Sequence, residues 1–377
     1  MHRTLVLLLA AMLVVPAAAA AKPNKKVCGD TAVGFAHCNS RVITDANGKP
    51  VSQQTPRGYG PADLQAAYAL PSASAGSGRT FAIVDAFDAP TAASDLNTYR
   101  STFHLPDCTT ANGCFRKVNQ SGNASPLPRA DGGWAQEISL DLDMASATCP
   151  NCKILLVEAN SNAFTDLAAA EDTAARLGAT VISNSYGGSE FSQETSSTYN
   201  SHFNHPGIPI TVSSGDAGYG VEFPAASQYV TAVGGTSLTK SGSAFSERAW
   251  SGAGSGCSAF VAKPSWQHDS GCSRRTVADV SAVADPNTGV AVYDSYRYQG
   301  AAGWMVFGGT SASAPIIAGA FALGGGTSPS NPYGNTAALH DVTSGSNGSC
   351  SVAYLCTAGT GFDGPTGLGT PNGVAAF

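Results

Sequence analysis

Charged residues are scarce in this chain: they make up 12% of its 377 residues, and the formal net charge is −6. With so mild a charge and no basic patch, the sequence gives no reason to expect a nucleic-acid partner. Long hydrophobic runs are missing too: the apolar run at residues 5–15 is too short for a transmembrane helix, and no later stretch is long enough. Internal repeats and a linker that splits the chain are also absent, which favours one large domain.

The first 21 residues have the features of a secretory signal. A short basic start, with His2 and Arg3, precedes the apolar run, and an alanine-rich end follows it. This order predicts cleavage near Ala20 or Ala21. We therefore expect a secreted, extracellular protein without membrane contact after cleavage; a retained N-terminal anchor is the alternative.

Ten cysteines fall into close neighbours along the chain. They are Cys28 and Cys38, Cys108 and Cys114, Cys149 and Cys152, Cys257 and Cys272, and Cys350 and Cys356. An even number behind a signal peptide indicates disulfides, and pairing between neighbours is our hypothesis. The C-x-x-C spacing at residues 149–152 also suits a redox site or half a zinc site, but no second C-x-x-C or paired histidines accompany it.

Strand and helix patterns alternate along most of the chain. Buried strands are predicted at residues 79–87, 153–159, 180–186, 208–213 and 229–233, and helices at 61–70, 91–103, 133–147, 164–177 and 194–203. This alternation predicts an α/β fold with a mostly parallel central sheet and helices on both faces. Residues 22–57 are polar and turn-rich, so we expect an irregular N-terminal arm before a domain at residues 58–377.

A small-residue turn at residues 307–310 precedes Ser311 and leads into an apolar segment that predicts a buried helix. Gly308 and Gly309 allow a sharp turn and close approach of the backbone. Free N–H groups and the positive end of the helix dipole collect at such a start. Ser311 is therefore a candidate nucleophile, although Thr310 or Ser311 could simply be an N-cap.

An ordinary serine peptidase needs a histidine base, but none of the seven histidines has the His-Gly-Thr context that subtilisins use. The segment WAQEISLD at residues 134–141 offers an alternative, because Glu137 and Asp141 lie four residues apart on one helix face. Two neighbouring carboxyl groups can share a proton, so one can accept the serine proton while the other stabilises it. The simpler interpretation is that Glu137 and Asp141 are solvent-exposed carboxylates at the edge of the helix, without a catalytic role.

A third segment, SSGDAG at residues 213–218, follows a predicted buried strand. Parallel α/β sheets keep their sites at the carboxyl ends of the strands. A neutral Asp216 there could donate a hydrogen bond to an oxyanion, which requires a raised pKa. A tight Gly-Asp turn would explain the same residues without any function.

Together with GGTSASAP at residues 308–315, these motifs resemble the sedolisin family of serine-carboxyl peptidases, which share the subtilisin fold. The similarity runs from about Pro56 to the C-terminus. It implies an endopeptidase acting on proteins or peptides, with Ser311 as nucleophile, Glu137 as general base, Asp141 as its acidic partner and Asp216 as oxyanion donor. Carboxyl catalysis implies an acidic optimum, at about pH 3–5. Residues 184–188 resemble the lining of the family's substrate cleft.

The resemblance also implies one calcium site in the C-terminal tail. Its ligands would be the carboxylates of Asp341 and Asp363 and the backbone oxygens of Val342, Gly359 and Gly361. Mixed carboxylate and carbonyl oxygens suit calcium.

Two departures from the family pattern bear on function. Only residues 22–57 precede the similarity, whereas the family usually carries a large folded prodomain, so we expect the chain to act directly after export. Asp85 lies at the end of the first predicted strand, where a subtilisin has its triad aspartate. We expect Asp85 at most to support the catalytic residues.

We expect the endopeptidase to be a monomer. Two other functions remain as alternatives. One is a catalytically inactive secreted binding protein of the same fold. Another is an esterase using the same serine, but the G-x-S-x-G elbow of such enzymes is absent around Ser311.

Overall fold

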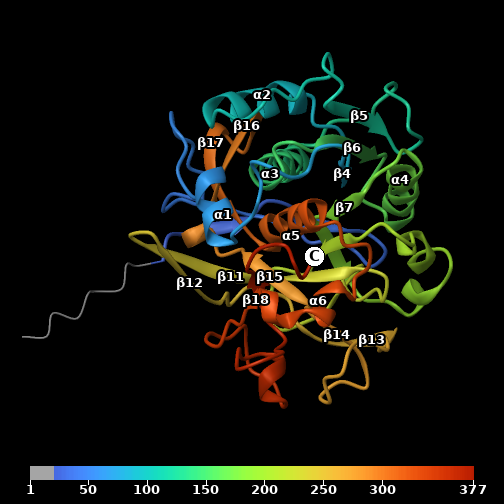
Figure 1. Cartoon of the computed structure of the whole chain (residues 1–377). Helices are drawn as coiled ribbons and strands as arrows, with labels where there is room; N and C mark the ends of the chain where they lie inside the picture. The colour runs from blue at the N-terminus through green and yellow to red at the C-terminus, as the bar shows by residue number, and fades with distance from the viewer. Residues whose placement is uncertain (1–20) are drawn as a thin grey trace, which may run out of the picture.

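A mostly parallel β-sheet forms the centre of the computed structural model, which describes residues 21–377 (Figure 1). In spatial order, its strands are β12 (Ala244–Ala249), β11 (Thr231–Ser241), β9 (Ile210–Ser213), β7 (Val181–Asn184), β4 (Thr80–Ala86), β6 (Lys153–Ala159) and β5 (Phe115–Asn119), and β15 (Val280–Val283) also pairs with β11. Only β12 runs antiparallel to its neighbour among these described strands. The predicted α/β class with a parallel sheet is confirmed.

Helices cover both faces of this sheet because the strands are apolar on both sides. The helices are α1 (Pro61–Ala67), α2 (Ala92–Thr102), α3 (Gly132–Thr148), α4 (Phe164–Arg176), α5 (Thr310–Gly324) and α6 (Asn331–Gly334). Figure 1 shows α3 and α5 side by side near the centre, with α4 beyond the strands β4 and β6. The two central helices carry Glu137, Asp141 and Ser311.

Local sequence fixes where α3 and α5 begin. The side chain of Asp131 caps α3 by accepting hydrogen bonds from the N–H groups of Gly133, at 3.0 Å, and Trp134, at 3.1 Å. The residue before α5 is Gly309, whose φ of 94° suits a residue without a Cβ. The predicted helices at 133–147 and after residue 310 are thereby confirmed to within a few residues.

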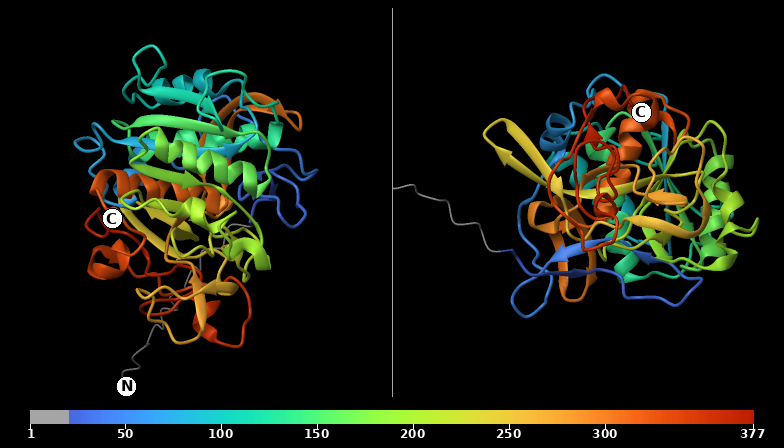
Figure 2. Two further views of the ribbon diagram at one scale, coloured as in Figure 1. Left: turned by 90° about the vertical axis from the view of Figure 1, so that its right-hand side faces the viewer. Right: turned by 90° about the horizontal axis from the view of Figure 1, so that it is seen from below.

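The N-terminal arm differs from our expectation. Residues 22–57 were expected to be irregular, yet they contain β1 (Asn24–Lys26), β2 (His37–Cys38) and β3 (Arg41–Ile43). Strand β3 joins a sheet with the hairpin of β16 (Val290–Tyr298) and β17 (Ala301–Gly308), while β2 pairs with β8 (Tyr186–Ser189), which also pairs with β10 (Glu222–Phe223). The right-hand view of Figure 2 shows the arm, in blue, crossing the lower side of the molecule. Pairing with distant strands gives the arm its structure.

The helix expected at residues 194–203 is also wrong. Two short 3₁₀ turns, Ser192–Thr195 and Asn200–Phe203, stand there instead. The carboxylate of Glu194 turns back to accept the N–H of Phe191 at 2.9 Å, which closes the first turn locally. Two small antiparallel pairs complete the fold: β13 (Gly256–Ala262) with β14 (Arg274–Val277), and β18 (Leu339–His340) with β19 (Thr370–Pro371).

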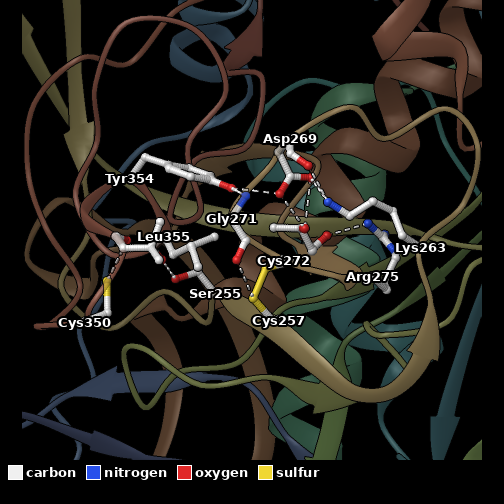
Figure 3. The surroundings of a disulfide bond; sticks show 12 residues. Ser255, Cys257, Lys263, Asp269, Gly271, Cys272, Arg275, Cys350, Tyr354 and Leu355 are labelled. Atoms are coloured by element: carbon white, nitrogen blue, oxygen red, sulfur yellow. Dashed lines mark hydrogen bonds and ion pairs between the residues drawn. A yellow bond between two sulfur atoms is a disulfide. The ribbon is translucent and has the colours of Figure 1, made fainter.

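All ten cysteines form disulfides between sequence neighbours, as predicted, including the pair at residues 149 and 152. Figure 3 shows how the surroundings of the Cys257–Cys272 bond reach the C-terminal tail: the N–H of Gly271 donates to the hydroxyl of Tyr354 at 2.6 Å, and this hydroxyl donates to Asp269 at 2.8 Å. The proposed signal sequence lies almost wholly outside the described residues. Within residues 21–377, no helix has the length and apolar character needed to cross a membrane.

The contact between α3 and α5 depends on Gly319. A Cβ at this position would lie 2.1 Å from Oγ1 of Thr148 on α3, which is closer than atoms can approach. Overpacking of this kind costs about 1–3 kcal/mol, whereas the helix propensity of alanine returns only about 1 kcal/mol. We expect Gly319→Ala to lower the free energy of unfolding by about 1–2 kcal/mol in urea titrations. Gly334→Ala is the control, because no atom lies within 4 Å of a Cβ there; equal effects of the two variants would contradict this account.

Candidate active site

Ser311 is the second residue of α5, and its side chain is fully buried. Its hydroxyl donates to the backbone carbonyl of Ser185 at 3.0 Å. In return, the hydroxyl of Ser185 donates to the carbonyl of Ser311 at 3.3 Å. That carbonyl is available because Pro315, four residues on, has no N–H for the usual helical bond. Ser311 is thus held against the segment that follows β7.

Asp216 lies just beyond the carboxyl end of β9 and points to the start of α5. Its Oδ1 accepts hydrogen bonds from the N–H of Thr310, at 2.7 Å, and from the hydroxyl of Thr310, at 3.0 Å. Its Oδ2 has no hydrogen-bond partner among residues 21–377. Burial raises the pKa of Asp216 to about 7, against the lowering effect of the Thr310 bonds and of Arg41. The group is therefore neutral in acid and can donate from Oδ2.

Glu137 and Asp141 are fully buried on α3, which excludes the solvated acidic edge. Burial raises the pKa of Glu137 to about 8, although the nearby hydroxyls of Ser40 and Ser311 lower it. Neither carboxyl oxygen of Glu137 has a hydrogen-bond partner in the described part of the chain. Asp141 accepts the hydroxyl of Ser185 at 2.7 Å. Burial, followed by the charges of Asp85 and Glu137, raises the pKa of Asp141 well above its usual range.

Asp85 belongs to the same cluster more closely than its expected supporting role suggests. It lies near the carboxyl end of β4, is fully buried, and has no hydrogen-bond partner for either oxygen within residues 21–377. Burial and the charges of Glu137 and Glu158 raise its pKa strongly. Its signal in the sequence is an aspartate inside an otherwise apolar strand. The charge of Glu137 raises the pKa of both aspartates, and that of Asp85 raises the pKa of Asp141, so the three carboxyl groups lie close enough to influence one another's protonation.

Two residues of the N-terminal arm also reach this site, although no sequence motif points to them. The carbonyl of Asn39 accepts the N–H of Ser311 at 2.8 Å, and the hydroxyl of Ser40 lies beside Glu137. By contrast, none of the histidines in the described part of the chain hydrogen-bonds with Ser311, Glu137 or Asp141: His37 faces Glu222, and His202 and His205 face Asp172. The titratable group that does lie beside the Ser311 hydroxyl is the carboxyl group of Glu137.

Hydrogen bonds join four of the five residues expected to hold calcium, Asp363 with Gly359 and Asp341 with Gly361. Asp363 accepts N–H groups from Gly359 and Thr366, and Asp341 accepts the N–H of Gly361 at 2.9 Å. The charge of Asp341 is close enough to raise the pKa of Asp363, which burial raises first, to about 7. The carbonyl oxygens of Val342, Gly359 and Gly361 accept no hydrogen bond from residues 21–377. Two neighbouring carboxyl groups beside free carbonyl oxygens fit the needs of calcium.

The constellation around Ser311 has the parts that acyl transfer by a serine requires. A serine stands at a helix start, a carboxyl cluster lies on one side of it, and a neutral carboxyl donor lies on the other. Carried by a parallel sheet with α3 and α5 on one face, it defines a serine-carboxyl type of site on a subtilisin-like scaffold.

Comparison with known proteins supports the subtilisin-like scaffold. The model described as "Subtilase family" matches residues 128–338, more than half of the chain. Kumamolisin from Bacillus sp. (strain MN-32) is 31% identical over 367 residues, which cover 85% of this chain and 63% of kumamolisin. Sedolisin from Pseudomonas sp. (strain 101) is 28% identical over 391 residues, which cover 91% of this chain and 65% of sedolisin. The chain belongs to the subtilase family and, within it, to the sedolisins.

A solved structure of Pseudomonas sedolisin, described as a serine-carboxyl proteinase complexed with two molecules of pseudo-iodotyrostatin, matches with a TM-score of 0.72 and 27% identity. The match covers 84% of this chain and 96% of that one. The chain thus matches almost the whole of this solved structure, but less than two thirds of the full length of either curated relative.

Proposed function

We propose that this protein is a secreted endopeptidase that hydrolyses peptide bonds through an acyl-enzyme on Ser311. The observation that carries the proposal is the convergence of Glu137, Asp141 and Asp216 on a serine at a helix start, without a histidine among its partners in residues 21–377. The similarity to a structure described as a serine-carboxyl proteinase supports it. Five disulfides are consistent with an oxidising, extracellular location.

Each carboxyl group has a distinct role in this mechanism. Glu137 accepts the proton of Ser311 as the hydroxyl attacks the carbonyl carbon of the substrate, and later returns it to the leaving amine. Asp141, anchored by Ser185, shares the proton with Glu137 and stabilises its charge. The protonated Oδ2 of Asp216 and the N–H of Ser311 hold the oxyanion.

Such a site favours acid for two reasons. The donor Asp216 must keep its proton, and with a pKa of about 7 it loses that proton above neutral pH. Burial raises the pKa of the base Glu137 to about 8 in the present structure. Once solvent or substrate enters the cleft, hydration would bring this carboxyl group toward its ordinary pKa near 4, where histidine would be fully protonated. We expect an optimum in the acid range with an alkaline limb near pH 7.

The tail residues Asp341, Val342, Gly359, Gly361 and Asp363 would hold one calcium ion. The ion would neutralise two neighbouring carboxylates and join the segment after β18 to the loop before β19. This is a structural contribution, at a distance from the chemistry of Ser311.

Removing the nucleophile gives the first test of the reaction. Ser311→Ala should lower kcat/KM on an unfolded protein by on the order of 10⁴-fold or more, because no acyl-enzyme can form. Ser313→Ala, the same exchange two residues along α5, should keep its activity. Near wild-type hydrolysis by Ser311→Ala would exclude the proposed nucleophile and leave the inactive binding protein or another catalytic centre to be considered.

The pH–rate profile tests the role of Asp216. An asparagine keeps an N–H donor but does not titrate, so in Asp216→Asn the alkaline limb near pH 7 should move to higher pH even if the maximal rate falls. Asp172→Asn alters a half-exposed carboxylate beside His202 and should leave the limb in place. An alkaline limb that stays at the same pH in Asp216→Asn would remove this residue from the oxyanion role.

Calcium should act on stability through binding to the folded state alone. With free calcium at a hundredfold excess over its Kd, the expected gain is about 2.7 kcal/mol, visible as a rise in Tm. Chelation should reverse the gain, and Asp363→Ala should abolish it. Asp107→Ala removes an exposed carboxylate elsewhere and should respond to calcium like the wild type. Identical melting curves with calcium and with chelator would contradict the site.

A further inference from the structure

We propose that Glu171 and Asn184 form a buried polar pair that positions Ser185 for the reaction at Ser311. The proposal rests on the peptidase function proposed above, and it adds two residues that the mechanism there does not use. Both act through Ser185 and not on the reacting atoms, so they are positioning residues.

Ser185 is the residue through which the pair acts. Its carbonyl accepts the hydroxyl of Ser311 at 3.0 Å, and its own hydroxyl donates to Asp141 at 2.7 Å. One residue therefore holds both the nucleophile and a member of the carboxyl cluster. A misplacement of about 1 Å in such a site can lower the rate on the order of 10²-fold, so the position of Ser185 bears directly on the reaction.

The chain leaves the central sheet at Ser185. Asn184 is the last residue of β7 and the last to pair with β4 and β9, and β8 begins at Tyr186. Successive side chains of an extended chain point to opposite sides. Ser185 therefore points toward α3 and α5, where its bonds lie, whereas Asn184 points toward α4, on the other side of the strands (Figure 1).

The carboxamide of Asn184 ties several segments together. Its oxygen accepts the hydroxyl of Tyr186 at 2.8 Å, which joins the residues on either side of Ser185. Its nitrogen donates weakly to the carbonyl of Thr211 in β9 at 3.5 Å, and the hydroxyl of Thr211 donates to the carbonyl of Ala314 in α5 at 3.0 Å. The side chain of Asn184 is fully buried, so water does not compete for these contacts.

Glu171 supplies a further partner for this carboxamide. It lies on α4, is fully buried, and has no other hydrogen-bond partner among residues 21–377. Burial raises the pKa of Glu171 well above its usual range, and the adjacent side chain of Asn184 opposes that rise. A neutral carboxyl group both donates and accepts, as a carboxamide does, so the two groups are complementary.

Packing alone gives no reason for an acid at this position. Leu167 and Ala174 lie on the same stripe of α4 as Glu171 and are buried with it. An apolar side chain would hold the helix against β7 without the cost of burying a carboxyl group. What the acid adds is a directional contact with Asn184, which an apolar side chain cannot provide.

The first test measures kcat and KM on unfolded casein, per folded molecule. Glu171→Leu and Asn184→Leu should each lower kcat by about 10- to 100-fold with KM changed less than about threefold, because Ser185 holds the catalytic groups and not the substrate. Glu171→Gln can still donate and accept, and should keep kcat within about threefold of the wild type. Thr173→Val, the control on the same helix, removes a buried hydrogen bond to Gln120 and should lower Tm but not kcat.

The second test asks whether the two residues are coupled. Glu171→Leu should lower Tm in the wild type, where it leaves the amide of Asn184 without this partner. The same exchange should raise Tm in the Asn184→Leu background, where it removes a buried acid that has lost its partner. The double variant should nevertheless keep the low kcat, because restored packing does not restore the hold on Ser185.

The outcomes separate this proposal from the peptidase function. An active wild type with unchanged kcat in Glu171→Leu would overturn the positioning role and leave the peptidase in place, and so would a double variant in which kcat recovers together with Tm. A rise in KM alone would place Asn184 in substrate binding, and Tm shifts of one sign in both backgrounds would show that no pair exists; either result overturns the proposal. A wild type that does not hydrolyse casein would overturn the peptidase function, and this inference with it.

Discussion

The site depends on one electrostatic constraint: Asp85, Glu137, Asp141 and Asp216 are buried together without an ion-pair partner among residues 21–377. For Asp216 alone, a pKa of about 7 against the usual 3.8 means a cost on the order of 4 kcal/mol for the ionised form. Such a cluster persists only on elements held by other contacts. The apolar packing of α3 and α5 on the sheet supplies them, and Gly319 lets the two helices approach closely.

The burial of these carboxyl groups also makes the stability of the fold depend on pH. Carboxyl groups with raised pKa values keep their protons in the folded chain while the unfolded chain releases them near pH 4. Their contribution is complete below that pH and is lost as the pH rises through about 7 for Asp216 and about 8 for Glu137. These groups therefore make the fold more stable in acid, which agrees with the acid optimum that we propose for its chemistry.

Most of the fold and the four proposed catalytic residues could be predicted because their signals are local. Strands such as β4 read as continuous apolar runs, α3 has its own cap in Asp131, and disulfides join near neighbours. What could not be predicted depends on distant partners. The arm has no periodicity, and its strands exist only through pairing with β8 and β17. Asp85 looked like a supporting residue because its contact with Glu137 is tertiary.

The arm and the carboxyl cluster are therefore parts of one arrangement. Ser40 of the arm lies beside Glu137, and burial raises the pKa of Glu137 to about 8. Access of water to this site would favour the ionised carboxylate and would lower the pKa of Glu137 toward the usual range of a carboxyl group. Asp216 owes its raised pKa to burial as well, and the hydrogen bonds from Thr310 oppose that rise, so a carboxylate base beside a protonated donor requires Glu137 to be hydrated while Asp216 stays buried.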